Sequence, residues 1–214
     1  MKKQISVEEA VAKVKDGMTI MVGGFLANGT PNKILDALSK ANVKNLTVIA
    51  NDAAFSNKGV GQLFINKQVK KYIASHIGSN ELIQEQLNNK EIEVELVPQG
   101  TLAERIRCGG CGLGGVLTQT GMGTIIADGK QVVNVDGKDY LLEKPLRADI
   151  AFVGASKGDK DGNLVYFGTS QNFNPWMAIA ADTVIAGVDN LVEVGEIAPE
   201  QVHTPAILVD YIVC

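Results

Sequence analysis

The segment Asp16–Pro31, DGMTIMVGGFLANGTP, constrains the fold more than any other part of the chain. An apolar strand over 19–22 runs into the double glycine Gly23–Gly24, and a short loop then closes on Gly29. Thr30 and the proline after it predict the start of a helix, with the threonine as N-cap. This order is typical of α/β proteins that bind an anion or a pyrophosphate, because glycine allows close backbone approach and a helix start offers unpaired N–H groups.

Apolar strands and amphipathic helices alternate over the first hundred residues. Strands are expected over 46–50, 68–75 and 91–97, and helices over 31–40, 81–88 and 102–108. Such alternation predicts an α/β fold with an open, mostly parallel sheet and flanking helices. Ligands in these folds bind beyond the carboxyl ends of the strands. The polar residues that follow two of the strands, Asn51, Asp52 and Ser75, are therefore candidates for lining a substrate site.

The second half of the chain differs in its glycine content and in its turn signals. The segment 108–129 holds eight glycines, which is too many for a packed helix. The dipeptide Asp136-Gly137 between two short apolar runs predicts a β-hairpin with a type I′ turn. Strands over 149–154, 164–167, 183–186 and 207–213 and a helix over 175–181 complete the expected elements. No linker rich in proline, serine or charge divides the chain, so residues 1–214 are expected to form a single domain.

Composition excludes several classes of protein. The formal net charge of −4 argues against a nucleic-acid partner. No apolar stretch approaches the length of a membrane span, and no secretory signal is visible, so a cytoplasmic location is expected. The three cysteines suit a reducing compartment better than a disulfide framework. With only two histidines, no metal site is expected.

Two short motifs overlap in the glycine-rich segment. The run Gly110–Gly115 fits the dinucleotide fingerprint GxGxxG, but the preceding TLAERIR predicts a helix capped by Thr101 and Glu104. The fingerprint must follow a strand, so a nicotinamide site is disfavoured. Cys108 and Cys111 fit CxxC, for which a redox pair stays open, although two small residues in a glycine loop are the favoured interpretation.

No catalytic residue can be assigned from the residues alone. The two histidines, His76 and His203, form no recognisable triad with a serine or a cysteine. None of the 24 acidic residues lies in an obvious nucleophile setting. A stand-alone enzyme with its own acid–base pair is therefore not indicated.

The Asp16–Pro31 segment resembles the signature of the alpha subunit of family I CoA-transferases, the 3-oxoacid type. That signature is Asp/Asn-Gly, two variable residues, three apolar residues, Gly-Gly-Phe, three variable residues, Gly, one variable residue and Pro, and every position fits. Four further runs are similar to the same subunit: VPQGTLAERIR, GGCGLGGVLTQTGMGT, LLEKPLRADIA and NFNPWMAIAA. The resemblance is strongest to the acetoacetate:butyrate/acetate branch. Cys108 and Cys111 depart from the family, which usually has a small residue such as alanine there.

The resemblance implies a fold shared with sugar-phosphate isomerases and an enzyme that moves CoA between a short-chain acyl-CoA and a free carboxylate. It implies no metal and no nicotinamide. The catalytic glutamate of the family lies in a Ser-Glu-Asn-Gly motif of the beta subunit, which this chain lacks. A beta-subunit partner and an alpha2-beta2 assembly are therefore implied, with no catalytic residue from this chain. The implied CoA-binding segment is Gly23, Gly24, Phe25, Leu26, Ala27, Asn28 and Gly29.

Two other functions remain as alternatives. A sugar-phosphate isomerase on the same fold would need an acid–base pair of its own. A ligand-sensing module would usually carry a helix-turn-helix, whereas here the core strand begins almost at once.

Overall fold

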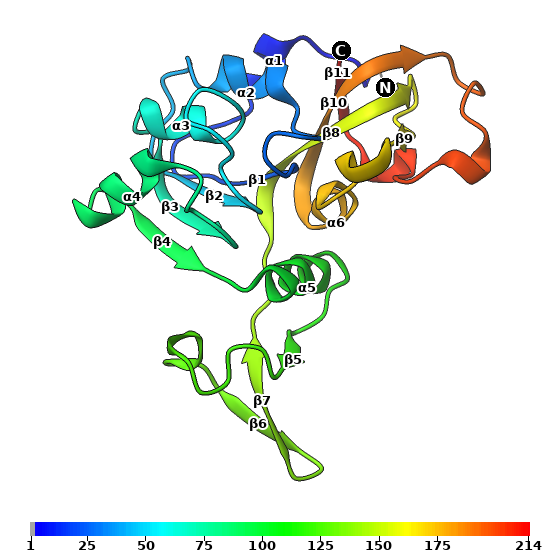
Figure 1. Ribbon diagram of the computed structural model, residues 1–214. Coiled ribbons are helices and arrows are strands. Elements are labelled where there is room, and N and C mark those ends of the chain that lie inside the picture. The colour runs from blue at the N-terminus through cyan, green and yellow to red at the C-terminus, as the bar shows by residue number, and fades with distance from the viewer. Residues whose placement is uncertain (1–2) are drawn as a thin grey trace.

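The computed structural model describes residues 3–214 as an α/β body and an arm that projects from it (Figure 1). The body contains an eight-stranded sheet with the order β11-β10-β8-β1-β2-β3-β4, in which β9 pairs with β8. All the described pairings in this sheet are parallel except that between β8 and β9. The predicted open, mostly parallel sheet with flanking helices is confirmed.

The strands of the body are β1 (Thr19–Val22), β2 (Leu46–Ala50), β3 (Val69–Ala74), β4 (Glu93–Leu96), β8 (Ala148–Asp159), β9 (Leu164–Val165), β10 (Ala181–Val192) and β11 (Tyr211–Val213). The helices are α1 (Val7–Val11), α2 (Asn32–Leu38), α3 (Gly61–Ile65), α4 (Glu81–Asn88), α5 (Gln99–Gly110) and α6 (Asn174–Ile179). Short 3-10 helices are η1 (Ile125–Ala127), η2 (Gly168–Ser170), η3 (Pro199–Gln201) and η4 (Ala206–Leu208).

Both faces of the sheet are buried. Along β1, Ile20 and Val22 join the core formed with helices α1 to α4, whereas Met21 joins the core formed with α5 and α6. Successive strand residues point to opposite faces, and both faces are covered by helices, so Ile20, Met21 and Val22 are all apolar and buried. This central position of β1 places the loop that follows it in the middle of the carboxyl edge.

Some element boundaries differ from the prediction. Helix α5 begins at Gln99, so Thr101 lies inside the helix and forms no capping box with Glu104. The N-cap position is Pro98, and its carbonyl accepts the N–H of Leu102 at 2.9 Å. The ring of Pro98 restricts φ to a value compatible with the entry into a helix. The helix α3 was missed because its five residues are too few to show a 3.6-residue periodicity.

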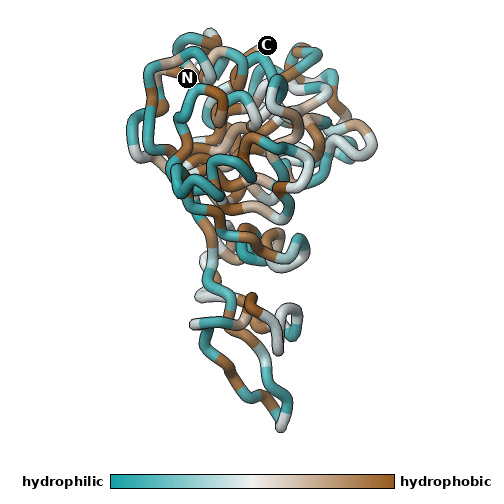
Figure 2. Tube along the Cα trace, turned by 60° about the vertical axis from the view of Figure 1, so that its left-hand side comes forward, coloured by the Kyte–Doolittle hydropathy of each residue, from teal (hydrophilic) through white to brown (hydrophobic). Residues whose placement is uncertain are grey.

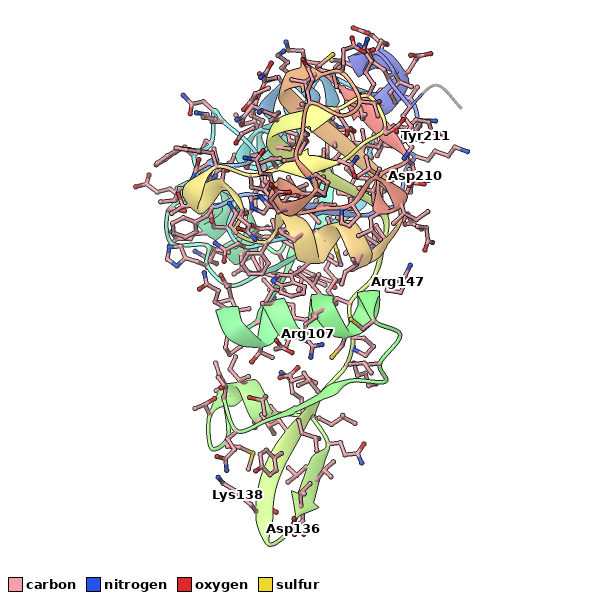
Figure 3. All side chains as sticks on the ribbon, turned by 90° about the vertical axis from the view of Figure 1, so that its right-hand side faces the viewer. Arg107, Asp136, Lys138, Arg147, Asp210 and Tyr211 are labelled. Carbon is pink, nitrogen blue, oxygen red and sulfur yellow. The ribbon has the colours of Figure 1, made fainter. Side chains whose placement is uncertain are left out.

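The arm is a three-stranded antiparallel sheet with the order β5-β7-β6. Its strands are β5 (Val116–Thr118), β6 (Val132–Val135) and β7 (Lys138–Glu143). The turn residues Asp136 and Gly137 have φ values of +50° and +80°, as a type I′ turn requires, and the predicted hairpin is confirmed. Figure 2 shows the arm as a separate projection from the body, and Figure 3 shows Asp136 and Lys138 at its tip.

A buried charge network ties the arm to the body. Arg105 of α5 donates from Nη1 to Oε1 of Glu95 on β4 at 2.6 Å, and from Nε to the carbonyl of Lys144 at 2.8 Å. The same Nε lies 3.9 Å from Oε2 of Glu143, whose side chain is 2% exposed and also pairs with Lys130. A carboxylate that is buried this deeply needs these partners, so the network holds the base of β7 against α5.

Within residues 3–214, no helix is both long enough and apolar enough to cross a bilayer.

Candidate functional site

The loop after β1 adopts a tight, partly left-handed conformation. Leu26 and Ala27 have φ values of +48° and +64°. Phe25 and Asn28 exchange backbone hydrogen bonds of 3.0 and 2.9 Å, which closes the turn. The side chains of Phe25 and Leu26 are 46% and 42% exposed, whereas Ala27 is buried. Two large apolar side chains therefore project from the centre of the carboxyl edge.

The three glycines of the loop are required by close neighbours. A Cβ atom at Gly23 would overlap the amide of Asn174, and one at Gly24 would overlap the Thr30 hydroxyl. Gly29 has a φ of +72°, and a Cβ there would overlap the backbone carbonyl of Ser170. Close approach of the protein's own backbone and side chains therefore accounts for each glycine, before any ligand is considered.

Thr30 is not the N-cap of α2, contrary to the prediction. The N-cap position is Pro31, which makes no side-chain cap. The Thr30 hydroxyl instead donates to the carbonyl of Gly23 at 3.0 Å. This bond joins the two ends of the loop, so the threonine closes the loop rather than starting the helix.

Two asparagines at the start of α6 hold the loop from one side. Oδ1 of Asn172 accepts the N–H of Gly24 at 3.0 Å, and its Nδ2 donates to the carbonyl of Asn28 at 3.1 Å. Asn174 is fully buried, donates to the carbonyl of Gly29 at 2.9 Å and accepts the N–H of Gly154 at 3.0 Å. Neither asparagine is among the site residues predicted from the sequence. The available signal was the pair of asparagines, two positions apart, at a predicted helix start.

Asp52 holds the loop from the other side. Both its carboxylate oxygens lie 3.2 Å from the N–H of Leu26, and Oδ1 also accepts the N–H of Ala54 at 2.7 Å. Oδ2 accepts Nδ2 of Asn51 at 2.7 Å. Asp52 as a residue is 6% exposed, so the hydrogen-bonding capacity of its carboxylate is directed at the protein itself.

The structure brings the three predicted substrate-lining residues together. The hydroxyl of Ser75 donates to Asn51, at 2.9 Å to its carbonyl and 2.8 Å to its Oδ1, and Nε2 of Gln99 donates to the same Oδ1 at 2.7 Å. With Asp52, they form one network beneath the loop. The network supports the loop; contact of these residues with substrate stays a prediction.

Replacement of Asp52 by asparagine should loosen the loop. The amide keeps the volume but loses the charge and an acceptor for the N–H groups of Leu26 and Ala54, and a charge-assisted hydrogen bond contributes about 1.5–3 kcal/mol. We expect a destabilisation of about 2 kcal/mol in chemical denaturation and faster amide exchange at Leu26. Ser75→Ala is the control within the network and should leave exchange at Leu26 near that of the wild type. Unchanged exchange in Asp52→Asn would contradict this role.

Two cavities border the loop. The first, here called the α2 pocket, has a volume of about 340 Å³ and lies between 27–34 and the strands β8 and β10. Lys33 and Asp189 are its two ionisable lining residues. The second, the α6 pocket, has a volume of about 460 Å³ and is lined by Phe25, Gln99, Ala103, Thr169, Asn172, Phe173 and Trp176. Neither lining includes a glutamate.

The remaining motifs form no second site. The Gly110–Gly115 run begins at the last residue of α5 and leads into β5, so it lacks the strand–loop–helix context of a dinucleotide fingerprint. Burial raises the pKa of the Cys108 thiol, which is the opposite of what a reactive cysteine needs. Cys111 is an exposed free thiol. Over residues 3–214, no cluster of three or more potential metal-ligating side chains is found.

Comparison with known proteins assigns the family. The model of the coenzyme A transferase family matches residues 4–214. The acetoacetyl-CoA:acetate/butyrate CoA transferase alpha subunit of Clostridium acetobutylicum is 54% identical over 211 residues, which are 99% of this chain and 97% of that protein. The acetate CoA-transferase subunit alpha of Escherichia coli K12 is 49% identical over 211 residues, 99% of this chain and 96% of that protein.

Solved structures show the same fold. An acyl-CoA transferase from E. coli O157:H7, in a thioester complex with CoA, has a TM-score of 0.88 at 23% identity over 98% of this chain. The chain spans 46% of that solved chain, about half of its length. Glutaconate coenzyme A-transferase from Acidaminococcus fermentans has a TM-score of 0.85 at 19% identity, covering 99% of this chain and 75% of that one. The protein described here therefore belongs to the coenzyme A transferase family.

Proposed function

We propose that the chain is the alpha subunit of a two-subunit enzyme that moves CoA between a short-chain acyl-CoA and a free carboxylate. The observation that carries the proposal is the 54% identity, over nearly the full length of both chains, to the C. acetobutylicum alpha subunit. That relative is named for acetoacetyl-CoA, acetate and butyrate, and we propose the same substrate class here.

The nucleophile is proposed to come from the partner. CoA transfer without ATP needs a carboxylate that can exchange between a free and an acylated state. Asp52 beneath the loop is buried and already accepts four hydrogen bonds from three neighbouring groups, so it is not free to attack. In the linings of the two pockets beside the loop, Asp189 is the sole acidic residue, and no glutamate is present. A beta subunit with a Ser-Glu-Asn-Gly glutamate, in an alpha2-beta2 assembly, would complete the site.

The chemistry proceeds by two exchanges at carbonyl carbons. The partner's glutamate attacks the acyl carbon, the C–S bond breaks, and the CoA thiolate departs. The product is a mixed anhydride between the acyl group and the glutamate. The thiolate then attacks the glutamyl carbon and releases the first carboxylate, which leaves a glutamyl-CoA thioester. The incoming carboxylate reverses both steps. Each attack builds charge on an oxygen, which fixed backbone N–H donors can stabilise.

The loop Gly23–Gly29 is proposed to hold CoA and to exclude water from the anhydride. Asp52 on one side and Asn172 and Asn174 on the other hold it, so its geometry is set before substrate arrives. A preorganised loop loses little conformational entropy on binding. The exposed Phe25 and Leu26 offer apolar surface beside the thioester. We further propose a cytoplasmic location, in which the three cysteines, free in the structure, would stay reduced.

The test uses separately purified subunits. The chain alone should transfer no CoA between acetoacetyl-CoA and acetate, and the mixture with its beta partner should do so. After incubation with acyl-CoA alone, mass spectrometry should find the covalent CoA adduct on a glutamate of the partner. Activity of the isolated chain, or an adduct on Asp189, would overturn the composite site. As a control, Asp189→Asn in the mixture should leave the adduct in place.

A further inference from the structure

The two pockets beside the loop differ in chemistry. The α2 pocket includes the ionisable side chains of Lys33 and Asp189 and the backbone at the start of α2. The lining of the α6 pocket contains no ionisable side chain. Three of its seven lining residues are aromatic, namely Phe25, Phe173 and Trp176. An apolar tail is better accommodated where no charge has to be desolvated.

The α6 pocket is built on rigid elements. Phe173 is 8% exposed and packs in the core between the sheet and the helices α5 and α6. Asn172 is held by its bonds to Gly24 and Asn28, so one wall of the pocket is part of the loop support. In Figure 1, α5 and α6 lie next to one another beneath the loop, in agreement with their packing. The pocket therefore has a defined shape before substrate binds.

Phe25 connects the loop to the pocket. Its side chain leaves the turn that is closed by hydrogen bonds to Asn28, and it is one of the pocket walls. Trp176, 42% exposed on α6, forms another wall. The Thr169 hydroxyl accepts Nδ2 of Asn28 at 2.8 Å and supplies a polar group at the same pocket. An acyl-CoA whose thioester carbon lies at the loop would therefore extend its acyl chain toward Trp176.

We propose that the α6 pocket receives the acyl group of the acyl-CoA and the tail of the acceptor acid, and that Trp176 limits the length of that tail. The ligand class is a short, unbranched acyl chain of few carbons with an uncharged end. This inference rests on the proposed function, since it assigns a place for the acyl group of that reaction. It leaves the α2 pocket outside the acyl site.

The experiment is a chain-length profile of kcat/KM. Acetyl-, butyryl- and hexanoyl-CoA would be compared as donors with the complete two-subunit enzyme. Burial of each further methylene should raise kcat/KM by about fourfold until the tail meets the wall. Trp176→Ala should raise the hexanoyl-to-acetyl ratio by about tenfold or more, because removal of the indole lets two further methylenes be buried at about fourfold each. Trp176→Phe should return the ratio most of the way to the wild-type value.

The matched control is Phe167→Ala, the same kind of truncation at an aromatic residue that lines the α2 pocket. It should leave the chain-length ratio unchanged. A loss of partner binding in Trp176→Ala would lower kcat/KM for all donors alike, so the ratio separates an acyl wall from a subunit contact.

Failure of this inference differs from failure of the proposed function. If the wild-type pair transfers CoA but the Trp176→Ala ratio equals that of the wild type, the acyl assignment is wrong and the transferase stands. A ratio that responds to Phe167→Ala instead would place the acyl group in the α2 pocket. If the wild-type pair transfers no CoA, the proposed function itself fails.

Discussion

Gly29→Ala should disable the loop and destabilise the chain by about 2–5 kcal/mol. Left-handed backbone costs a non-glycine residue about 1–2 kcal/mol, and Gly29 has a φ of +72°. The added Cβ would also overlap the carbonyl of Ser170 and approach its Cα to 3.0 Å, for which about 1–3 kcal/mol is typical of overpacking. In the reconstituted enzyme, kcat/KM for acyl-CoA should fall by roughly a hundredfold, since displacement of a positioning element by 1 Å can cost that much. Denaturant unfolding and steady-state kinetics measure the two effects.

Gly17→Ala is the matched control for the backbone strain. Gly17 precedes β1, has a φ of +79°, and an added Cβ would meet nothing within 4 Å. This variant should lose only about 1–2 kcal/mol of stability, with kcat/KM unchanged. Equal losses of stability and activity in the two variants would show that the contact with Ser170 plays no part.

Arg105→Met should destabilise the protein by about 3–5 kcal/mol, because it removes two charge-assisted hydrogen bonds, to Glu95 and to the Lys144 carbonyl, and the positive charge beside the buried Glu143. Glu143, whose side chain is 2% exposed, would keep only its pair with Lys130, and the half-buried Glu95 would keep only its 3.2 Å pair with Lys71. For a chain of this length the midpoint of thermal unfolding should fall on the order of 10 °C. The double variant Arg105→Met/Glu95→Gln should recover part of the lost stability, because it also removes the Glu95 charge that Arg105 neutralises in the wild type.

The neighbouring Arg107→Met is the control, and Figure 3 shows this arginine on the same helix. Arg107 pairs with Glu104 at 2.7 Å, with side chains that are 34% and 45% exposed. An exposed pair contributes about 0–1 kcal/mol, so the midpoint should hardly move. A similar loss in both variants would mean that helix α5, rather than the buried network, is sensitive to the loss of an arginine.

The cost of Arg105→Met should depend on pH. Burial alone would raise the pKa of Glu95, but the hydrogen bond and charge of Arg105, with help from Lys71, lower it overall. A lowered carboxyl pKa stabilises the fold above the usual value of 4.5, and this stabilisation is lost as the pH falls through the lowered folded-state pKa. The difference between wild type and variant should therefore be largest near neutral pH and shrink below about pH 4. A constant difference from pH 3 to pH 7 would argue against the carboxylate network.

Local patterns predicted much of the fold correctly. The strands over 19–22 and 46–50 and the helix over 81–88 were predicted with the bounds that the structure gives them. Each is an uninterrupted apolar or amphipathic run, for which periodicity is informative. The strands β8 and β10, at twelve residues each, extend well beyond the predicted 149–154 and 183–186. Their ends pair with each other along the sheet, and pairing between distant segments leaves no local pattern.

For the site, the sequence by itself determined the glycine loop, its place at the carboxyl edge, and the lack of the family's glutamate motif. These follow from residue order, because a strand, a glycine turn and a helix impose their geometry locally. Only the tertiary structure decided what holds the loop. Asn172 and Asn174 lie 148 and 145 positions away from the loop residues they bind, and the Thr30 hydroxyl turns back to Gly23 instead of capping α2. Hydrogen bonds over such separations exist only after the sheet has assembled, so no local pattern of residues could have indicated them.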